Sequence, residues 1–489
     1  MNILVWGLSG AFLVSLAGGF GLFLLPWTVL FILSGAALLR QILSDHRAGR
    51  DWLSSRPQWT LFLLCLTVYL STFRWHGGDD IPGSLLPYSF LGHGTLTLDP
   101  FPEWAGRDNM RDLVRLVDGH WFSAYPVAPS ILASPLYVLP VFFRVEPSDV
   151  FLHNLAKIAG ASLTALSAVV VFRALQASCS RRWAAAVTLL YAFGSYSFSV
   201  SSQALYSHGP AQLGVALGVM GLASRPALPL VSGLGFGLAV VSREDSVFFA
   251  VAAGLYMLFH KRPWLPKFLA GFAVPVSLNL AYWLLCTGRL QPPYFDSQSG
   301  QFSTFSVEAL VAMLLSPSRG MVFFFPAAAF GVWALRGAWR RPASGWMPYF
   351  AAACFAVWVF YGFRCSWTGG NTFGNRYFSV VCMVLALFCG EAEESVRGSP
   401  GLAWAWSVLF SFCVGVHAMG AYFNWPGAGW TLVQQQAQGW SLSQFPLMHL
   451  LTAQGALGAL GVGPRIVAAV AMLAWGIPLS FWMRRFIRA

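Results

Sequence analysis

The chain has 489 residues, of which 57% are hydrophobic and only 10% are charged. Soluble domains carry about 25% charged residues, so this composition excludes an ordinary water-soluble protein and indicates an integral membrane protein. The net charge is +12. The Lys and Arg residues lie in short links between apolar runs, which is typical of membrane topology and argues against binding of nucleic acid.

Apolar runs recur along the whole chain, and a transmembrane helix needs about 20 apolar residues. The sequence therefore predicts an all-α polytopic membrane protein with about 12–14 transmembrane helices. The expected spans are 3–21, 24–42, 58–74, 151–172, 184–202, 209–224, 227–242, 246–260, 267–286, 320–336, 346–362, 376–390, 402–421 and 464–483.

Basic residues recur in alternate links between these runs, which the positive-inside rule assigns to the cytoplasmic side. The opposite side is then external. The chain contains no Asn-x-Ser/Thr sequon, which favours a bacterial inner membrane. The basic groups are Arg40, Arg47, Arg50 and Arg56; Arg173, Arg181 and Arg182; Lys261, Arg262 and Lys267; Arg336, Arg340 and Arg341; and Arg484, Arg485 and Arg488.

The first long external link, 75–150, begins with two adjacent acids, Asp79 and Asp80. Paired carboxylates at a membrane boundary raise each other's pKa, so one of them could act as a base near neutral pH. The alternative is a helix cap or turn, and the spacing alone favours that interpretation. Later in the same link, the proline-punctuated segment from Tyr125 to Phe143 predicts an interfacial helix.

Three later external links place arginine next to apolar segments: SREDS, LLSPSRGMVFFFP and YGFRCSWTGGNTFGNRYFS. A charge at mid-membrane costs roughly 2.5–3.5 kcal/mol, so each arginine needs a partner. That partner is either a carboxylate or a phosphate. Three such links on one face favour an anionic ligand. The charged residues concerned are Arg243, Glu244, Asp245, Arg319, Arg364 and Arg376.

The third of these links also contains a glycine loop, whose backbone amides can approach an anion closely. The residues of the loop are Gly369, Gly370, Asn371, Gly374 and Asn375. His208 begins an apolar run at the external side, where a lone histidine is more often structural than catalytic. The sequence contains no metal-ligand motif. A divalent cation is still possible as a cofactor, because carboxylates are present to bind it.

The Gly-Asp-Asp sequence in the first external loop resembles the Gly-Asp-Glu/Asp loop of the GT-C glycosyltransferases. This superfamily includes the bacterial lipid A aminoarabinose transferases and the protein O-mannosyltransferases. The segments YPVAPSILASPLY, SHGPAQLGVALGV, GLAVVSREDS, LLSPSRGMVFFFPA and WTGGNTFGNRYF are similar to its bacterial members, in that order, over roughly residues 60–390.

The resemblance implies a sugar donor on polyprenyl phosphate and a single inverting displacement. It places the catalytic carboxylate on Asp79, with Asp80 as its neighbour, or on Asp80, with Asp79 as its neighbour. This sequence departs from the family pattern at Asp80, where many relatives carry Glu. It assigns the lipid phosphate to Arg319 and Arg376, with Arg243 close by. Weaker substrate contacts are expected from Tyr125, His208, Glu244, Asp245, Asn371, Asn375 and Asp118, the last being the nearest match to a second family acid.

The chemistry of the reaction agrees with these residue types. A base must remove the proton of the acceptor hydroxyl as it attacks the anomeric carbon. The phosphate leaving group needs positive charge rather than a strong acid. The expected partners are the lipid-linked donor, an acceptor that is a glycan, lipid or protein, and membrane lipid.

The expected organisation is an N-terminal hairpin with a cytoplasmic link at 1–57, a catalytic core at 58–391, and C-terminal helices at 392–489. A lipid-linked saccharide transporter or flippase is the main alternative, because intramembrane charges also mark transport paths. Polar residues gathered at one face argue against it. A polysaccharide polymerase or ligase is the third possibility, and the early acidic loop argues against that.

Overall fold

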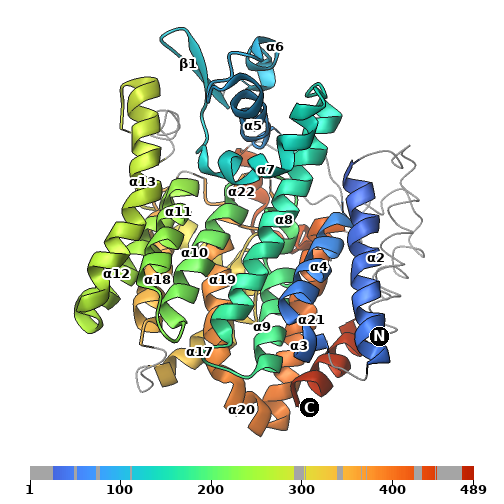
Figure 1. Ribbon diagram of the computed structural model, residues 1–489. Coiled ribbons are helices and arrows are strands. Elements are labelled where there is room, and N and C mark those ends of the chain that lie inside the picture. Colours follow the sequence, from blue (N-terminus) through green and yellow to red (C-terminus); the bar gives the residue numbers. More distant parts are fainter. Residues whose placement is uncertain are drawn as a thin grey trace. The chain divides into compact units, whose positions relative to one another are not determined.

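The computed structural model describes residues 26–48, 52–72, 78–110, 113–290, 302, 304–338, 345–364, 366–370, 372–422, 432–446, 448 and 476–488 (Figure 1). These residues form two compact units that are interleaved along the sequence. Unit 1 comprises Met1–Val169, Ser201–Leu213 and Ser277–Ser297, and unit 2 comprises Val170–Val200, Gly214–Val276 and Gln298–Ala489.

Unit 1 begins with two packed apolar helices, α2 (Pro26–Arg47) and α4 (Pro57–Leu70), with the short α3 (Trp52–Ser55) before the second. The hydroxyl of Thr67 on α4 donates a 3.0 Å hydrogen bond to the hydroxyl of Ser34 on α2. Such a bond between helices offsets the cost of burying hydroxyl groups. These helices match the expected runs 24–42 and 58–74, whereas the run 3–21 lies outside the described residues.

The segment expected as the first external loop folds into short helices around a β-hairpin. The segment expected as an interfacial helix is α7, which packs against α5. The hairpin was not expected: β1 pairs antiparallel with β2 through a turn at Asp118 and Gly119, both with positive φ. The elements are α5 (Ile81–His93), α6 (Pro102–Ala105), η2 (Asp108–Met110), β1 (Val114–Val117), β2 (His120–Ser123) and α7 (Ala128–Phe142).

Three described helices are long and apolar enough to cross a membrane, which confirms an integral membrane protein. They are α8 (Asp149–Leu175), the segment Arg262–Thr287 that contains α13 (Leu265–Thr287), and α21 (Pro400–Tyr422). Together with the shorter apolar helices, they confirm the all-α fold class, because the hairpin is the only sheet among the described residues.

The helices of unit 2 follow the predicted runs closely, and the part of α10 from Gly214 onward, which belongs to this unit, packs against α11 through glycine. A methyl group built on Gly235 would come within 2.4 Å of the backbone nitrogen of Gly218. The first elements are α9 (Arg181–Phe193), η3 (Ser197–Ser201), α10 (His208–Ala223), α11 (Pro229–Ser242), η4 (Glu244–Ser246), α12 (Val247–His260) and η5 (Arg262–Trp264).

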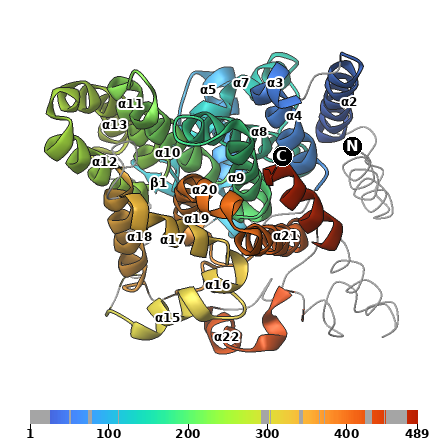
Figure 2. The same cartoon turned by 90° about the horizontal axis from the view of Figure 1, so that it is seen from below.

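The predicted span 320–336 is wrong as a single helix, because the chain breaks at Pro326. This residue has no N–H to continue the helix, so α16 ends at Phe324 and α17 begins at Ala328. Figure 2 shows α17, α18 and α19 side by side, and the three pack on one another. The later elements are α15 (Val307–Leu315), α16 (Met321–Phe324), α17 (Ala328–Ala338), α18 (Met347–Tyr361), η8 (Arg376–Phe378), α19 (Ser379–Phe388), η9 (Cys389–Ala392), α20 (Glu393–Gly398), α22 (Leu432–Gln438) and η10 (Leu442–Gln444), with a last helix over 476–488.

Candidate active site

The two early acids lie in a turn that leads into α5. Gly78 has a φ of +86°, and its carbonyl accepts a hydrogen bond from the backbone of Ile81. Asp80 occupies the N-cap position of α5, but its side chain makes no capping hydrogen bond. The backbone therefore has the turn that the sequence allowed, while the Asp80 carboxyl is not used as a cap. Asp79 is half-buried and Asp80 is only 1% exposed.

Burial raises the pKa of the Asp80 carboxyl from 3.8 to about 6. The cause is loss of water around the charged form. The charge of Asp79 raises this pKa further, whereas His153 on α8 and a backbone hydrogen bond lower it. Nδ1 of His153 lies 2.7 Å from the carbonyl oxygen of Asp149. Because a carbonyl only accepts, Nδ1 holds a proton in this arrangement.

Buried hydroxyl groups lie on α5, which begins after Asp80, and on α7, which packs against α5. Burial raises the pKa of the Tyr137 hydroxyl, and the nearby charge of Asp80 raises it as well. The Tyr137 ring meets the ring of Tyr88 edge-on at 5.9 Å. Buried polar atoms are nearly always hydrogen-bonded. Within the described part of the chain, however, Oδ1 of Asp80 and the hydroxyls of Tyr88 and Ser130 have no partner, whereas the hydroxyls of Ser84 and Tyr137 interact with each other.

A buried lysine on α8 binds a residue just after α4 and the segment before α10. Lys157, 1% exposed, lies one turn after His153, so both side chains are on one helix face. Its Nζ donates to the carbonyl oxygen of Ser202 at 2.9 Å, to Oγ1 of Thr72 at 3.1 Å and to Oε1 of Gln203 at 3.2 Å. All three ammonium hydrogens therefore have an acceptor.

The other candidate residues of unit 1 have different surroundings. Asp118 is exposed at the hairpin turn, where its φ of +49° is explained by a two-residue turn. The backbone N–H of Tyr125 donates to the hydroxyl of Ser123 after β2. His208 is buried at the start of α10. The substrate roles of Asp118, Tyr125 and His208 stay predictions.

In unit 2, Arg243 has a carboxylate partner. Its Nε lies 2.9 Å from Oδ2 of Asp245, and its Nη2 donates to the hydroxyl of Tyr361 at 2.6 Å. The Tyr361 hydroxyl in turn donates to the same Asp245 oxygen at 2.6 Å. This closed triangle favours the carboxylate interpretation of Arg243 over the phosphate interpretation. Burial raises the pKa of the neighbouring Glu244 carboxyl.

Arg319 is buried, with 3% exposed, and it supports the glycine loop. Its Nη1 donates to the carbonyl oxygens of Thr372 and, at 3.0 Å, of Gly374. Burial lowers the pKa of its guanidinium to about 10, and the nearby charge of Arg376 lowers it further. Arg319 therefore remains charged at neutral pH, and the two predicted phosphate ligands are electrostatic neighbours.

Arg376 lies against the glycine loop that precedes it. A methyl group built on Gly370, which has a φ of +77°, would lie 3.5 Å from Nη2 of Arg376. Asn375 is fully buried: its Nδ2 donates to the carbonyl of Trp367 at 2.9 Å, and its Oδ1 accepts from the backbone of Tyr377 at 3.2 Å. Asn375 thus fixes the loop, whereas Asn371 lies outside the described residues.

Two stacked tyrosines join the Arg243 triangle to the glycine loop: Tyr361 belongs to the triangle, and Tyr377 follows Arg376. The rings of Tyr361 and Tyr377 lie 4.1 Å apart and within 5° of parallel. The guanidinium of Arg364 lies 5.0 Å from the centre of the Tyr377 ring. The three arginine-bearing links of unit 2 therefore come together. The acids belong to unit 1, and their convergence with the arginines stays a prediction.

Sequence reasoning missed His153, Lys157 and Tyr361. A lone lysine in the apolar run of α8 is a signal that could have found Lys157, because intramembrane charges are rare. His153 could then have followed from its four-residue spacing. No such signal identifies Tyr361. Among the described residues, no three His, Cys, Asp or Glu side chains gather as ligands for a metal ion.

No family model and no curated protein matches the sequence. Among solved structures, the chain is similar to the archaeal oligosaccharyltransferase AglB from Archaeoglobus fulgidus in complex with an inhibitory peptide and a dolichol-phosphate, with 12% identity over 76% of this chain and a TM-score of 0.46. It is also similar to the apo form of the Archaeoglobus fulgidus oligosaccharyltransferase, with 13% identity over 79% of this chain and a TM-score of 0.41. The chain spans 56% of the length of each. At these values the likeness assigns no activity.

Proposed function

We propose that this protein is a GT-C type membrane glycosyltransferase that moves a sugar from a polyprenyl-phosphate donor to an acceptor hydroxyl on the external face of a bacterial inner membrane. The observation that carries the proposal is the turn at Gly78, where the half-buried Asp79 adjoins the buried Asp80. The side chain of Asp80 caps no helix, and its pKa is raised to about 6. Carboxyls with perturbed pKa values are typical of catalytic sites.

Asp79 is the proposed base. A base must come within hydrogen-bond reach of the proton that it removes, and geometry takes precedence over pKa. The half-buried Asp79 is more accessible than Asp80, which is 1% exposed. Asp80 then acts as its electrostatic neighbour. The unpartnered hydroxyls of Tyr88 on α5 and Ser130 on α7 support a carbohydrate substrate, because sugar hydroxyls can satisfy such groups.

The reaction is a single displacement at the anomeric carbon. Asp79 takes the proton of the acceptor hydroxyl while the acceptor oxygen forms a bond to that carbon. The bond from the same carbon to the phosphate oxygen breaks, and the lipid phosphate leaves with the electron pair and its negative charge. Arg376 is the proposed ligand of that phosphate. Arg319 supports the loop and adds positive charge, which stabilises the developing anion.

Transport is the less favoured function. The buried Lys157 is an intramembrane charge of the kind that transporters use. Its ammonium, however, donates to three fixed acceptors within unit 1. A cation held in this way serves the packing of the helices rather than a moving substrate.

Mass spectrometry of lipid copurified with the protein tests the function. The wild type should carry polyprenyl phosphate, the spent donor, whereas Asp79→Asn should carry polyprenyl phosphate with its sugar still attached. The reason is that an amide cannot accept the acceptor's proton. Asp108→Asn, at an exposed position of η2 in the same loop, is the control and should match the wild type. Absence of polyprenyl phosphate from every preparation would overturn the proposed donor, and identical lipids in wild type and Asp79→Asn would overturn the assigned base.

A further inference from the structure

Unit 2 contains a cavity of about 210 Å³ formed at one end of its helices. Its lining comes from the α8–α9 link, the α10–α11 link, the α12–α13 link, the start of α18 and the end of α19. These links include the basic groups that the sequence assigns to the cytoplasmic side. The cavity is therefore separate, in the expected topology, from the external links that contain Arg319 and Arg376.

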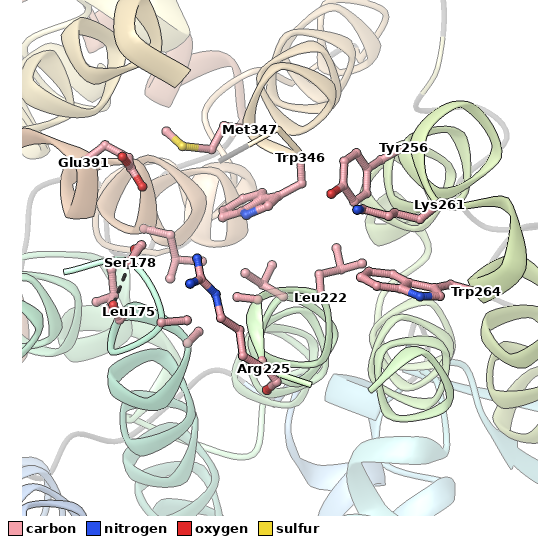
Figure 3. A pocket seen from close by; sticks show the side chains of 16 residues that line it. Leu175, Ser178, Leu222, Arg225, Tyr256, Lys261, Trp264, Trp346, Met347 and Glu391 are labelled. Atoms are coloured by element: carbon pink, nitrogen blue, oxygen red, sulfur yellow. Dashed lines mark hydrogen bonds between the residues drawn. The ribbon is translucent and has the colours of Figure 1, made fainter. Parts of the chain in front are cut away.

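Two cations and one acid line this cavity. Figure 3 shows the guanidinium of Arg225 and the ammonium of Lys261 pointing inward from different links, with Glu391 on the opposite wall. Within the described residues, Arg225 has no hydrogen bond or ion pair. Nζ of Lys261 lies 5.3 Å from the centre of the Trp264 ring. The charged lining has a net charge of +1, which complements a phosphodiester with its single negative charge.

The remaining walls suit an amphiphile at a membrane boundary. Trp264, Trp346 and Tyr256 line one side, and Trp and Tyr are enriched at the headgroup level of membranes. Leu175 and Leu222 supply apolar surface beside Arg225. The volume lies below the roughly 300–1,000 Å³ of pockets for drug-sized ligands. Its size therefore suits a small charged group such as a headgroup phosphate better than a drug-sized ligand.

We propose that this cavity binds the phosphodiester of a phospholipid headgroup in the cytoplasmic leaflet. Arg225 and Lys261 bind the phosphate oxygens, the aromatic wall contacts the glycerol region, and the leucines contact the start of an acyl chain. Basic pockets between transmembrane helices on the cytoplasmic side recognise headgroups in this way. The proposal is independent of the glycosyltransferase assignment, because it uses none of the residues named for that reaction.

Native mass spectrometry of the delipidated full-length protein in detergent tests the site. The probes are dioleoyl phosphatidylglycerol, dioleoylglycerol, which lacks the phosphate, and inorganic phosphate. We expect Arg225→Gln and Lys261→Gln each to weaken the first phosphatidylglycerol-binding step about tenfold, since each removes a charge-assisted contact. Arg262→Gln is the matched control: Arg262 is exposed in the same link as Lys261 but does not line the cavity.

Equal phosphatidylglycerol affinity in the wild type, both cavity variants and the control would overturn the site. Dioleoylglycerol binding as tightly as phosphatidylglycerol would overturn the role of the phosphate. Displacement of the lipid by millimolar inorganic phosphate, lost in Arg225→Gln, would assign the site to soluble phosphate and overturn the lipid source. Thermal unfolding of each variant in the same detergent identifies any variant that fails to fold. Arg225→Lys, which retains the charge, should bind phosphatidylglycerol with most of the wild-type affinity that Arg225→Gln loses.

Discussion

Nζ of Lys157 donates a 3.1 Å hydrogen bond to Oγ1 of Thr72, a residue 85 positions away in the sequence. Thr72 lies just after the end of α4, a few positions before Asp79 in the sequence. The same ammonium also binds Ser202 and Gln203. One buried cation therefore holds the end of α4 against α8.

We predict that Lys157→Met lowers the free energy of unfolding by about 1–3 kcal/mol, because buried acceptors lose their donor. Thr72 and Gln203 can still bond to each other, so the carbonyl of Ser202 loses most. Thermal unfolding in detergent measures the change. The exposed Lys267 provides the control as Lys267→Met, which should unfold like the wild type. Unchanged stability in Lys157→Met would show that the three bonds contribute nothing net.

Asp80 predicts a dependence of stability on pH. Its pKa is raised in the folded state from 3.8 to about 6, so between these values the folded protein retains a proton that the unfolded chain has lost. Stability should therefore fall as the pH rises from about 4 to about 6, by up to about 3 kcal/mol. Asp80→Asn removes this titration and should be more stable than the wild type at pH 7.

Chemical unfolding of wild type and Asp80→Asn between pH 4 and pH 7 measures this difference. Asp118→Asn is the control, because Asn suits the same hairpin turn and the side chain is exposed. It should follow the wild-type curve throughout. A wild-type protein that gains stability across this pH range relative to Asp80→Asn would contradict the raised pKa of the Asp80 carboxyl.

Arg376→Ala should weaken binding of polyprenyl phosphate at least tenfold, since a charge-assisted contact contributes about 1.5–3 kcal/mol. Arg289→Ala removes an exposed arginine outside the glycine loop and should leave the affinity within about twofold of wild type. Native mass spectrometry with added polyprenyl phosphate gives both constants. If both variants bind equally well, Arg376 is not the phosphate ligand.

The helices could be predicted because an apolar run long enough to cross a bilayer is a local property of the sequence. The runs 58–74, 151–172 and 402–421 correspond to α4, α8 and α21. The β-hairpin also had a local signal, an Asp-Gly pair between short alternating segments. That signal was overlooked because only interfacial helices were expected in the loop.

The partners of the charged residues could not be predicted, because they come from distant parts of the chain. Arg243 binds Asp245, two residues away, but also Tyr361, which belongs to another helix. Arg319 donates to carbonyl oxygens of the glycine loop. The type of a residue indicates that it needs a partner, and only the fold determines whether that partner is a side chain, the backbone or a ligand.

The glycine loop provides the last prediction, Gly374→Ala. Gly374 has a φ of +64°, and a methyl group built on it would lie 2.6 Å from Cε1 of Tyr196 and 2.8 Å from Cδ1 of Phe324. The loop must shift to relieve this overlap, which moves the carbonyl that accepts from Arg319. We expect the free energy of unfolding to fall by roughly 2–4 kcal/mol. The amount of copurified polyprenyl phosphate should also fall. Gly337→Ala in α17, where no atom lies within 4 Å of the added methyl, is the matched control and should keep both properties. Wild-type stability and lipid content in Gly374→Ala would mean that the loop tolerates the shift and that Arg319 does not depend on its conformation.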